Sequence, residues 1–186
     1  MNIRKLFSVS KPKLFVIFAL PSILVAGCNA TPPPTYNEAR NKKYIEKVSM
    51  AYGSVKAGEQ RIEEQMNELM DSPSMHKDQS WQDRARVTSG VLLVPNILLD
   101  EVEAAGVPLE HRQFHDDFKI LSKKSEKCSK MFTMLTIAFI KAPTNWISPI
   151  SDEFIISRMD LKNAREEIRP RLVELREKYC IVQPTL

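Results

Sequence analysis

The sequence predicts an all-α protein, with an antiparallel, up-down-up-down four-helix bundle in residues 36–186. Apolar residues recur at alternating steps of three and four over two long segments, as they do on the buried face of a helix in a bundle. Only five glycines occur in 186 residues, and the alternation of apolar and polar residues that is typical of strands is hard to find. Four helices of about thirty residues each would fill this part of the chain.

The first predicted helix carries one apolar seam, in which Glu59 is the only polar member. The seam consists of Ile45, Val48, Tyr52, Val55, Ile62, Met66 and Leu69. A loop around residues 72–74 follows it. The 3-4 spacing indicates a helix that packs in a bundle or a coiled coil.

The second predicted helix begins near Asp78 and ends at Gly106, before Pro108. Its apolar positions include Trp81, Ala85, Leu92, Leu98 and Val102. Residues 91–99 are apolar nearly all round and contain Pro95. Because proline removes a backbone donor, this segment predicts a buried, bent helix.

The third and fourth predicted helices follow the same spacing. The third seam consists of Val107, His111, Phe114, Phe118, Leu121, Ser125, Cys128, Phe132, Leu135 and Phe139. The fourth helix begins near Ser151 and carries Ile155, Met159, Ala164, Ile168, Leu172, Leu175 and Tyr179. Pro170 should bend it. Short loops around residues 106–107 and 143–145 favour antiparallel neighbours.

Residues 1–27 have the order of a secretory signal peptide. Four basic residues and no acid come first: Arg4, Lys5, Lys11 and Lys13. Residues 14–25 then form an apolar run of roughly a dozen residues, whereas a membrane-spanning helix needs about twenty. Small residues, Ala26 and Gly27, precede Cys28.

The stretch LVAGC, residues 24–28, resembles the lipobox of bacterial lipoproteins. In that family the cysteine sulfur receives a diacylglycerol, the bond before it is cut, and fatty acids such as palmitate hold the protein on the membrane. The resemblance implies that Cys28 is lipidated and that residues 1–27 are removed. It covers residues 1–28 only, and it leaves open a chance cysteine behind an ordinary signal or an uncleaved anchor.

Residues 28–35 are expected to form a tether behind the lipid. They contain three consecutive prolines, which favour an extended polyproline segment of about 3 Å per residue. In Gram-negative lipoproteins an aspartate after the cysteine favours the inner membrane. Asn29 stands there instead, so the resemblance implies the outer membrane facing the periplasm, and surface exposure stays open.

Removal of the signal peptide leaves a formally neutral chain. The whole sequence has 27 Lys and Arg against 23 Asp and Glu, and residues 1–27 hold four of the basic residues and no acid. The overall positive charge therefore belongs to the removed segment. This balance argues against nucleic acid as a partner.

His111 and His115 are the strongest candidates in the sequence for ligands of a metal or haem, although they are weak ones. They are four apart and so share a helical face, which could present both rings to a metal. No His-Glu-x-x-His, Glu-x-x-His or Cys-x-x-Cys-His motif accompanies them, so two structural histidines, no metal and no cofactor are the prediction. Non-covalent haem, with an imidazole or a methionine as axial ligand, is the alternative.

Cys128 and Cys180 are an even pair in a compartment that oxidises thiols, which favours a disulfide. A straight hairpin of the last two helices would place them about 27 Å apart along the axis, whereas a disulfide needs Cα atoms within about 7 Å. Either one of the two helices breaks, or the cysteines do not pair within one chain.

No motif in the sequence predicts an enzyme, since a nucleophile elbow and a glycine-rich phosphate loop are both lacking, and no catalytic residue is predicted.

Seven methionines follow Cys28, and the apolar segment 131–140, which Trp146 and Ile147 could extend, contains two of them. They fill a flexible core or bind an apolar ligand or a partner helix. The prediction is a non-enzymatic envelope lipoprotein that acts through protein contact, as an adaptor, assembly, exclusion or inhibitor protein. The alternative is a bundle that binds a hydrophobic ligand or haem.

Overall fold

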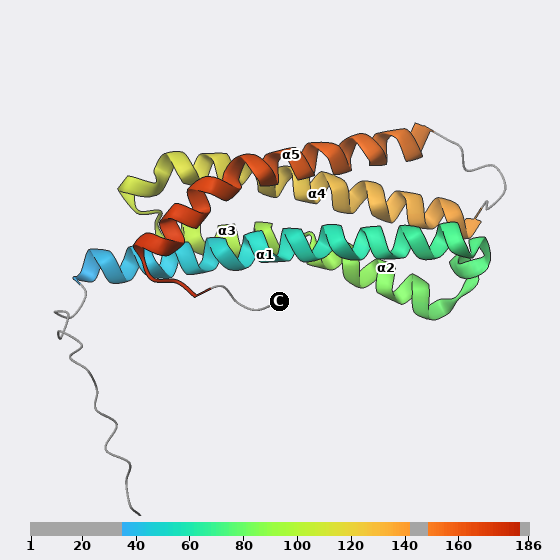
Figure 1. Cartoon of the computed structure of the whole chain (residues 1–186), viewed down its shortest axis with the longest axis horizontal. Coiled ribbons are helices and arrows are strands. Elements are labelled where there is room, and N and C mark those ends of the chain that lie inside the picture. Colours follow the sequence, from blue (N-terminus) through green and yellow to red (C-terminus); the bar gives the residue numbers. More distant parts are fainter. Residues whose placement is uncertain (1–34, 142–148, 183–186) are drawn as a thin grey trace, which may run out of the picture. The chain divides into compact units, whose positions relative to one another are not determined.

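The computed structural model describes residues 35–141 and 149–182 of the chain. Five α-helices and two short 3₁₀ helices account for nearly all of these residues, and no strand occurs among them (Figure 1). The predicted all-α class is therefore confirmed. The predicted signal peptide, residues 1–27, lies outside the described residues, and of the predicted tether, residues 28–35, only Thr35 is described.

The first helix, α1 (Tyr36–Asp71), begins directly after Thr35. The Thr35 hydroxyl accepts a hydrogen bond from the Glu38 backbone N–H at 3.3 Å, and the Glu38 carboxylate accepts one from the Thr35 N–H at 2.8 Å. This reciprocal pair satisfies two backbone donors that a helix start leaves open. The residues Thr35-x-x-Glu38 thus fix where α1 begins.

The second predicted helix is present as two shorter helices, which follow the 3₁₀ helix η1 (Pro73–Lys77). They are α2 (Gln79–Val91), capped by the Asp78 carboxylate, and α3 (Val94–Ala105). The break lies at Leu92 and Leu93, just before Pro95, which has no N–H to continue the hydrogen bonds of α2. The Ser125 hydroxyl donates to the Leu92 carbonyl at 2.7 Å, so a carbonyl at the break is satisfied from α4.

Gly106 ends α3 in a conformation that favours glycine, with φ at +81°. Its carbonyl accepts a hydrogen bond from the Arg40 guanidinium at 2.8 Å, which joins the start of α1 to the end of α3. The 3₁₀ helix η2 (Leu109–His111), α4 (Arg112–Lys141) and α5 (Pro149–Lys178) follow. Pro170 lies inside α5.

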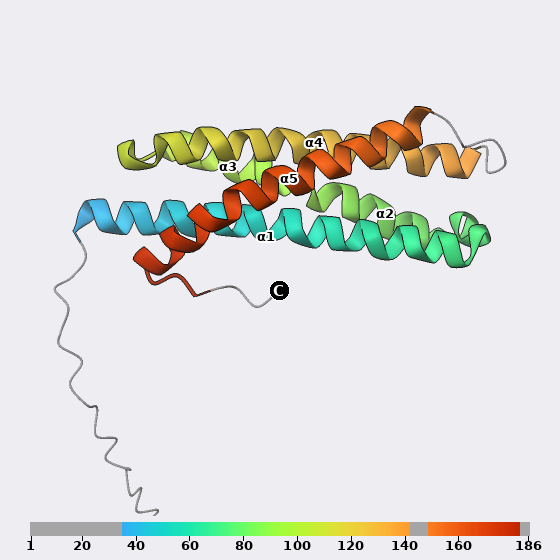
Figure 2. The ribbon, with the colours of Figure 1, turned by 45° about the horizontal axis from the view of Figure 1, so that its top comes forward.

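The helices enclose one core. α1 contacts α2, α3 and α5, and α4 contacts the same three helices, so α1, the α2–α3 arm, α4 and α5 each have two neighbours around it (Figure 2). The largest fully buried side chains come from all of them: Trp81, Phe114, Phe118, Phe132, Ile45, Ile62, Leu92, Leu121, Leu135, Leu161, Leu172 and Val48. The seams of the first and third predicted helices are buried, except for Met66 and Val107, which are partly buried, and Glu59.

Candidate functional site

The predicted lipidation site Cys28 lies outside the described residues, as do Trp146 and Ile147. Among the described residues, no helix is both long enough and apolar enough to cross a membrane. The prediction of a lipid anchor thus stays a prediction. The other predicted site residues, His111, His115, Cys128 and Cys180, are all described.

His111 and His115 belong to a histidine–tyrosine cluster with Tyr44 and Tyr179. The His111 ring stacks on Tyr44 with centroids 5.2 Å apart and an angle of 8° between the planes, and the Tyr44 hydroxyl lies 3.4 Å from His115 Nδ1. The Tyr179 hydroxyl lies 3.3 Å from His111 Nε2. Both histidines are buried. The cluster therefore joins α1 and the start of α4 to the end of α5.

Burial favours the uncharged forms of His111 and Tyr44 inside this cluster, and charged groups lie at its edge. Burial lowers the pKa of His111, and burial also raises the pKa of Tyr44. His115 Nε2 lies 3.0 Å from the Glu103 carboxylate, which also pairs with Lys119 at 2.7 Å. Hydrogen bonds from Lys119 and His115 lower the pKa of Glu103. The cluster is arranged to hold three segments together.

Whether the two histidines belong to a metal site can be judged for the described residues. In residues 35–141 and 149–182, no three His, Cys, Asp or Glu side chains gather in a way that could hold a metal ion. The shared helical face of His111 and His115 was visible in the sequence. Tyr44 and Tyr179 were missed as their partners, because they lie at distant positions and the spacing within one helix cannot reveal contacts between helices.

Cys128 and Cys180 carry free thiols in the structure. Cys128 is buried, and burial raises the pKa of its thiol to about 11, so the thiol is protonated at neutral pH. Cys180 is exposed just after the end of α5, with φ at +50°. Cys128 is thus a core residue, and a buried, protonated thiol of this kind is expected to have low reactivity.

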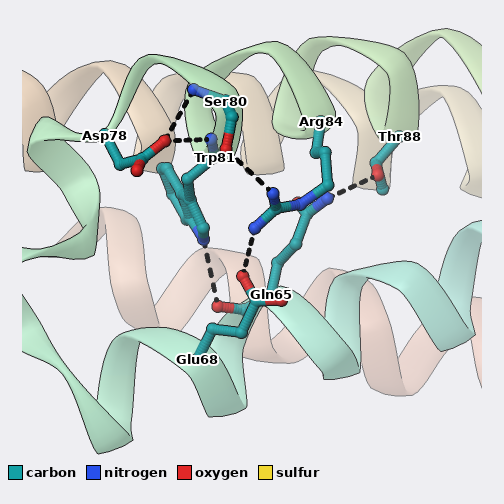
Figure 3. A network of polar contacts seen from close by, with 7 residues as sticks. All are labelled: Gln65, Glu68, Asp78, Ser80, Trp81, Arg84 and Thr88. Atoms are coloured by element: carbon teal, nitrogen blue, oxygen red, sulfur yellow. Dashed lines mark hydrogen bonds and ion pairs between the residues drawn. The ribbon is translucent and has the colours of Figure 1, made fainter.

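A polar network fastens α2 to α1 (Figure 3). The buried Trp81 donates its indole N–H to the Gln65 backbone carbonyl at 3.4 Å, and the Gln65 amide donates to the Thr88 hydroxyl at 3.0 Å. At the surface, Arg84 pairs with Glu68 at 2.5 Å. Each contact links α1 to α2. The network therefore holds α2, a short helix that ends just before Leu92, in a fixed position along α1.

Large apolar side chains remain exposed where α4 ends and α5 begins. This exposed apolar set consists of Met134 (48% exposed), Ile137 (45%), Ile140 (40%), Ile155 (53%), Ile156 (55%) and Met159 (61%). The Phe132 and Phe154 ring centroids lie 5.7 Å apart, which shows that the end of α4 and the start of α5 are in contact. Two of the methionines noted in the sequence thus lie at the surface.

A groove of about 710 Å³ lies between α1 and α5. It is lined by Ser49, Tyr52, Gly53, Lys56, Ala57, Gln60, Arg61, Glu64, Arg165, Arg169, Leu172, Val173 and Arg176. Five of these residues are basic and one is acidic. Sequence reasoning missed this site, although Arg165, Arg169 and Arg176 follow a helical spacing on one face of the last helix.

Comparison with protein-family models, with curated proteins and with solved structures gives no significant match for this chain.

Proposed function

We propose that the protein is a non-enzymatic, lipid-anchored lipoprotein of the bacterial envelope whose helical bundle acts by binding another protein. Cys28 carries the lipid, residues 1–27 are removed as a signal peptide, and residues 28–35 tether the bundle to the outer membrane on its periplasmic side. The lipobox sequence supports the anchor, and the exposed apolar set supports the protein contact.

The exposed apolar set is the observation that carries the proposal. Exposed apolar side chains that gather at one place mark interaction surfaces more often than chance, and a side chain such as Ile or Met contributes about 1.5–3 kcal/mol when it becomes fully buried. Ile155, Ile156 and Met159 are each more than half exposed on two successive turns of α5. A partner protein that covers them would remove this apolar surface from water.

The position of the exposed apolar set suits a protein held at its N-terminus. Arg40 and Asn41, near the start of α1, contact Gly106 and Glu110, which precede α4. The distance along α4 from its first residue to Met134 is about 33 Å at 1.5 Å per residue. An anchor before α1 would therefore leave the exposed apolar set at the far end of the bundle, where a partner can reach it.

The bundle in this proposal is antiparallel, with the α2–α3 arm running back along α1. Two contacts support this direction: Lys47 pairs with Glu101 at 2.5 Å, and Gln65 donates to Thr88 at 3.0 Å. A later residue of α1 thus meets an earlier residue of the arm. The proposal also includes a bend of this arm at Pro95, which the break between α2 and α3 supports.

The same reasoning applies to α4 and α5. Asp117, early in α4, pairs with Arg171, late in α5, at 3.1 Å, whereas Phe132 packs on Phe154. These contacts support an antiparallel pair and hence an up-down-up-down order. A bend of α5 at Pro170 belongs to the proposal because proline there leaves one carbonyl of the preceding turn without its helical donor.

Site-specific photocrosslinking in the native envelope tests the protein contact. A photoreactive residue in place of Ile156 or Met159 should yield a discrete adduct with a protein, because both side chains are exposed within the apolar set. The same residue in place of Lys42, which is exposed near the start of α1, is the matched control and should yield no such adduct. Equal labelling at all three positions, or none, would contradict the proposal.

The alternative function, a site for haem or a hydrophobic ligand, makes a different prediction. His111 Nε2 faces Tyr179 and His115 Nε2 faces Glu103, so an imidazole would have to give up a contact before it could ligate iron. An absorbance spectrum of the purified chain with a Soret band would favour haem. Native mass spectrometry that retains a small molecule would favour an apolar ligand.

A further inference from the structure

The groove between α1 and α5 has an unbalanced charge. Its basic lining residues are Lys56, Arg61, Arg165, Arg169 and Arg176, and Glu64 is the one acidic residue in its lining. The lining runs from Ser49 to Glu64 on α1, which spans about 22 Å at 1.5 Å per residue. The groove is thus long as well as basic.

Two of the five cations are balanced by neighbouring carboxylates. Arg165 pairs with Glu59 and with Glu166, the latter at 3.0 Å, and Arg169 pairs with Glu166 at 3.4 Å. The Arg165–Glu59 pair is largely buried. Arg165 therefore helps to join α5 to α1, whereas the Arg169–Glu166 pair lies within α5.

The other three cations have no carboxylate partner within ion-pair distance in residues 35–141 and 149–182. Lys56 and Arg61 are exposed on α1. Arg176 donates to the Ser49 hydroxyl at 2.9 Å and to the Ser49 carbonyl at 3.3 Å, both neutral acceptors. The groove therefore carries positive charge that the fold itself does not neutralise.

The groove also has an apolar floor. Val173 is 36% exposed and Ala57 is half-buried, so these two residues offer apolar atoms to a ligand, whereas Leu172 and Gly53 are buried. A ligand that follows the groove would meet apolar atoms below and cations on both walls. A purely polar anion would leave this floor uncovered.

We infer that the groove between α1 and α5 binds an acidic amphipathic helix of another protein. Such a helix presents carboxylates to both walls and an apolar stripe to the floor, in the manner of other helix-in-groove complexes. The cations match this ligand because they are spread out: Lys56 and Arg61 lie on α1, and Arg169 and Arg176 are about 10 Å apart along α5. A phosphate site would instead need its donors to converge on one point.

The acidic segment comes from another chain. Residues 1–34, 142–148 and 183–186, the parts of this chain outside the described residues, contain no Asp or Glu. These parts of the chain therefore lack the required charge. The groove lining shares no residue with the exposed apolar set, and this inference does not rest on the proposed function.

Fluorescence anisotropy on the full chain, purified in detergent, tests the inference. The probe is a labelled synthetic peptide of about 18 residues, with Leu at helical 3-4 spacing and Glu elsewhere, long enough to follow the groove. A matched peptide carries Gln in place of every Glu. The Glu peptide should bind about tenfold more tightly or better, and added salt should weaken it, because the contact depends on exposed charges.

Charge-reversal variants place the binding in the groove. The triple variant Lys56→Glu, Arg61→Glu and Arg169→Glu should weaken binding by about tenfold or more. The control triple variant Lys43→Glu, Lys123→Glu and Lys127→Glu changes the net charge equally at exposed positions outside the groove lining, and it should bind as the unchanged chain does. Circular dichroism checks that both remain helical. Should the groove triple variant fail to fold, Lys56→Glu alone should still weaken binding.

Several outcomes would overturn the inference. They are equal affinity for the Glu and Gln peptides, no measurable binding of either, and an equal loss in the control variant. Groove-dependent binding of polyphosphate that is tighter than binding of the Glu peptide would indicate a phosphate polymer as the ligand. Tighter groove-dependent binding of phosphatidylglycerol vesicles would indicate a membrane surface. Self-association that only the groove variant abolishes would indicate a second copy of this chain.

Discussion

At the scale of single residues, His111 shows how burial sets the charge of a side chain. Its ring lies between Tyr44 and Tyr179 and is almost fully buried. Burial disfavours the imidazolium and lowers its pKa, while the nearby Glu110 carboxylate acts in the opposite direction. At neutral pH the ring is therefore neutral, and its contribution to stability depends on pH.

The sign of that dependence follows from proton binding. Because the folded-state pKa of His111 is depressed, the unfolded chain takes up a proton at a higher pH than the folded chain. We expect the free energy of unfolding to fall as pH falls below about 6.5, the usual pKa of histidine. Urea unfolding of His111→Phe between neutral and mildly acidic pH should show a weaker dependence on pH.

Glu110→Gln is the matched variant for this prediction. It removes the carboxylate that raises the pKa of His111, so the loss of stability with falling pH should become larger. An unchanged pH dependence in His111→Phe would show that another group is responsible.

Gly58 matters at the scale of the helices, because it lets α1 and α2 approach closely where the α2–α3 arm breaks. A Cβ atom at Gly58 would lie 2.5 Å from Leu92 Cδ2, and Leu92 is fully buried, so it has little room to move. At Gly90, by contrast, no atom outside its chain neighbours and the nearby backbone of its own helix lies within 4 Å of the position that a Cβ would take. The two glycines therefore form a matched pair.

The prediction is that Gly58→Ala lowers the free energy of unfolding by about 1–3 kcal/mol through overpacking. Gly90→Ala should be neutral or stabilising by up to about 1 kcal/mol, because alanine has the higher helix propensity. Urea unfolding measures both. Equal effects of the two substitutions would show that the close contact with Leu92 does not exist in solution.

The sequence allowed the helices to be predicted because their signals are local. The 3-4 seams through Ile45 and Phe118 mark buried faces, and Asp78 precedes a helix start. The break at Leu92 was expected only as a bend around Pro95, since the serine of α4 that satisfies the Leu92 carbonyl lies 33 residues away. Contacts between helices, such as those of Tyr44 with His111 and His115, need the fold before they can be seen.

At the scale of the whole molecule, the two proposed surfaces serve different contacts on one scaffold. The exposed apolar set lies at the end of α4 and the start of α5, and the basic groove runs between α1 and the second half of α5. Neither was predictable from composition, because the chain without its first 27 residues is formally neutral. A neutral total can hide a local excess of charge, and only the packing of α5 on α1 gathers these cations.

The proposed function depends on a lipid at Cys28, which would set the compartment in which the bundle meets its partner. Growth of the host with labelled palmitate, followed by isolation of the chain and of its Cys28→Ser variant, tests this directly. We predict that the unchanged chain incorporates the label and begins at Cys28 when its intact mass is measured, whereas Cys28→Ser does neither. Labelling of the variant, or an unlabelled chain that retains residues 1–27, would contradict the account.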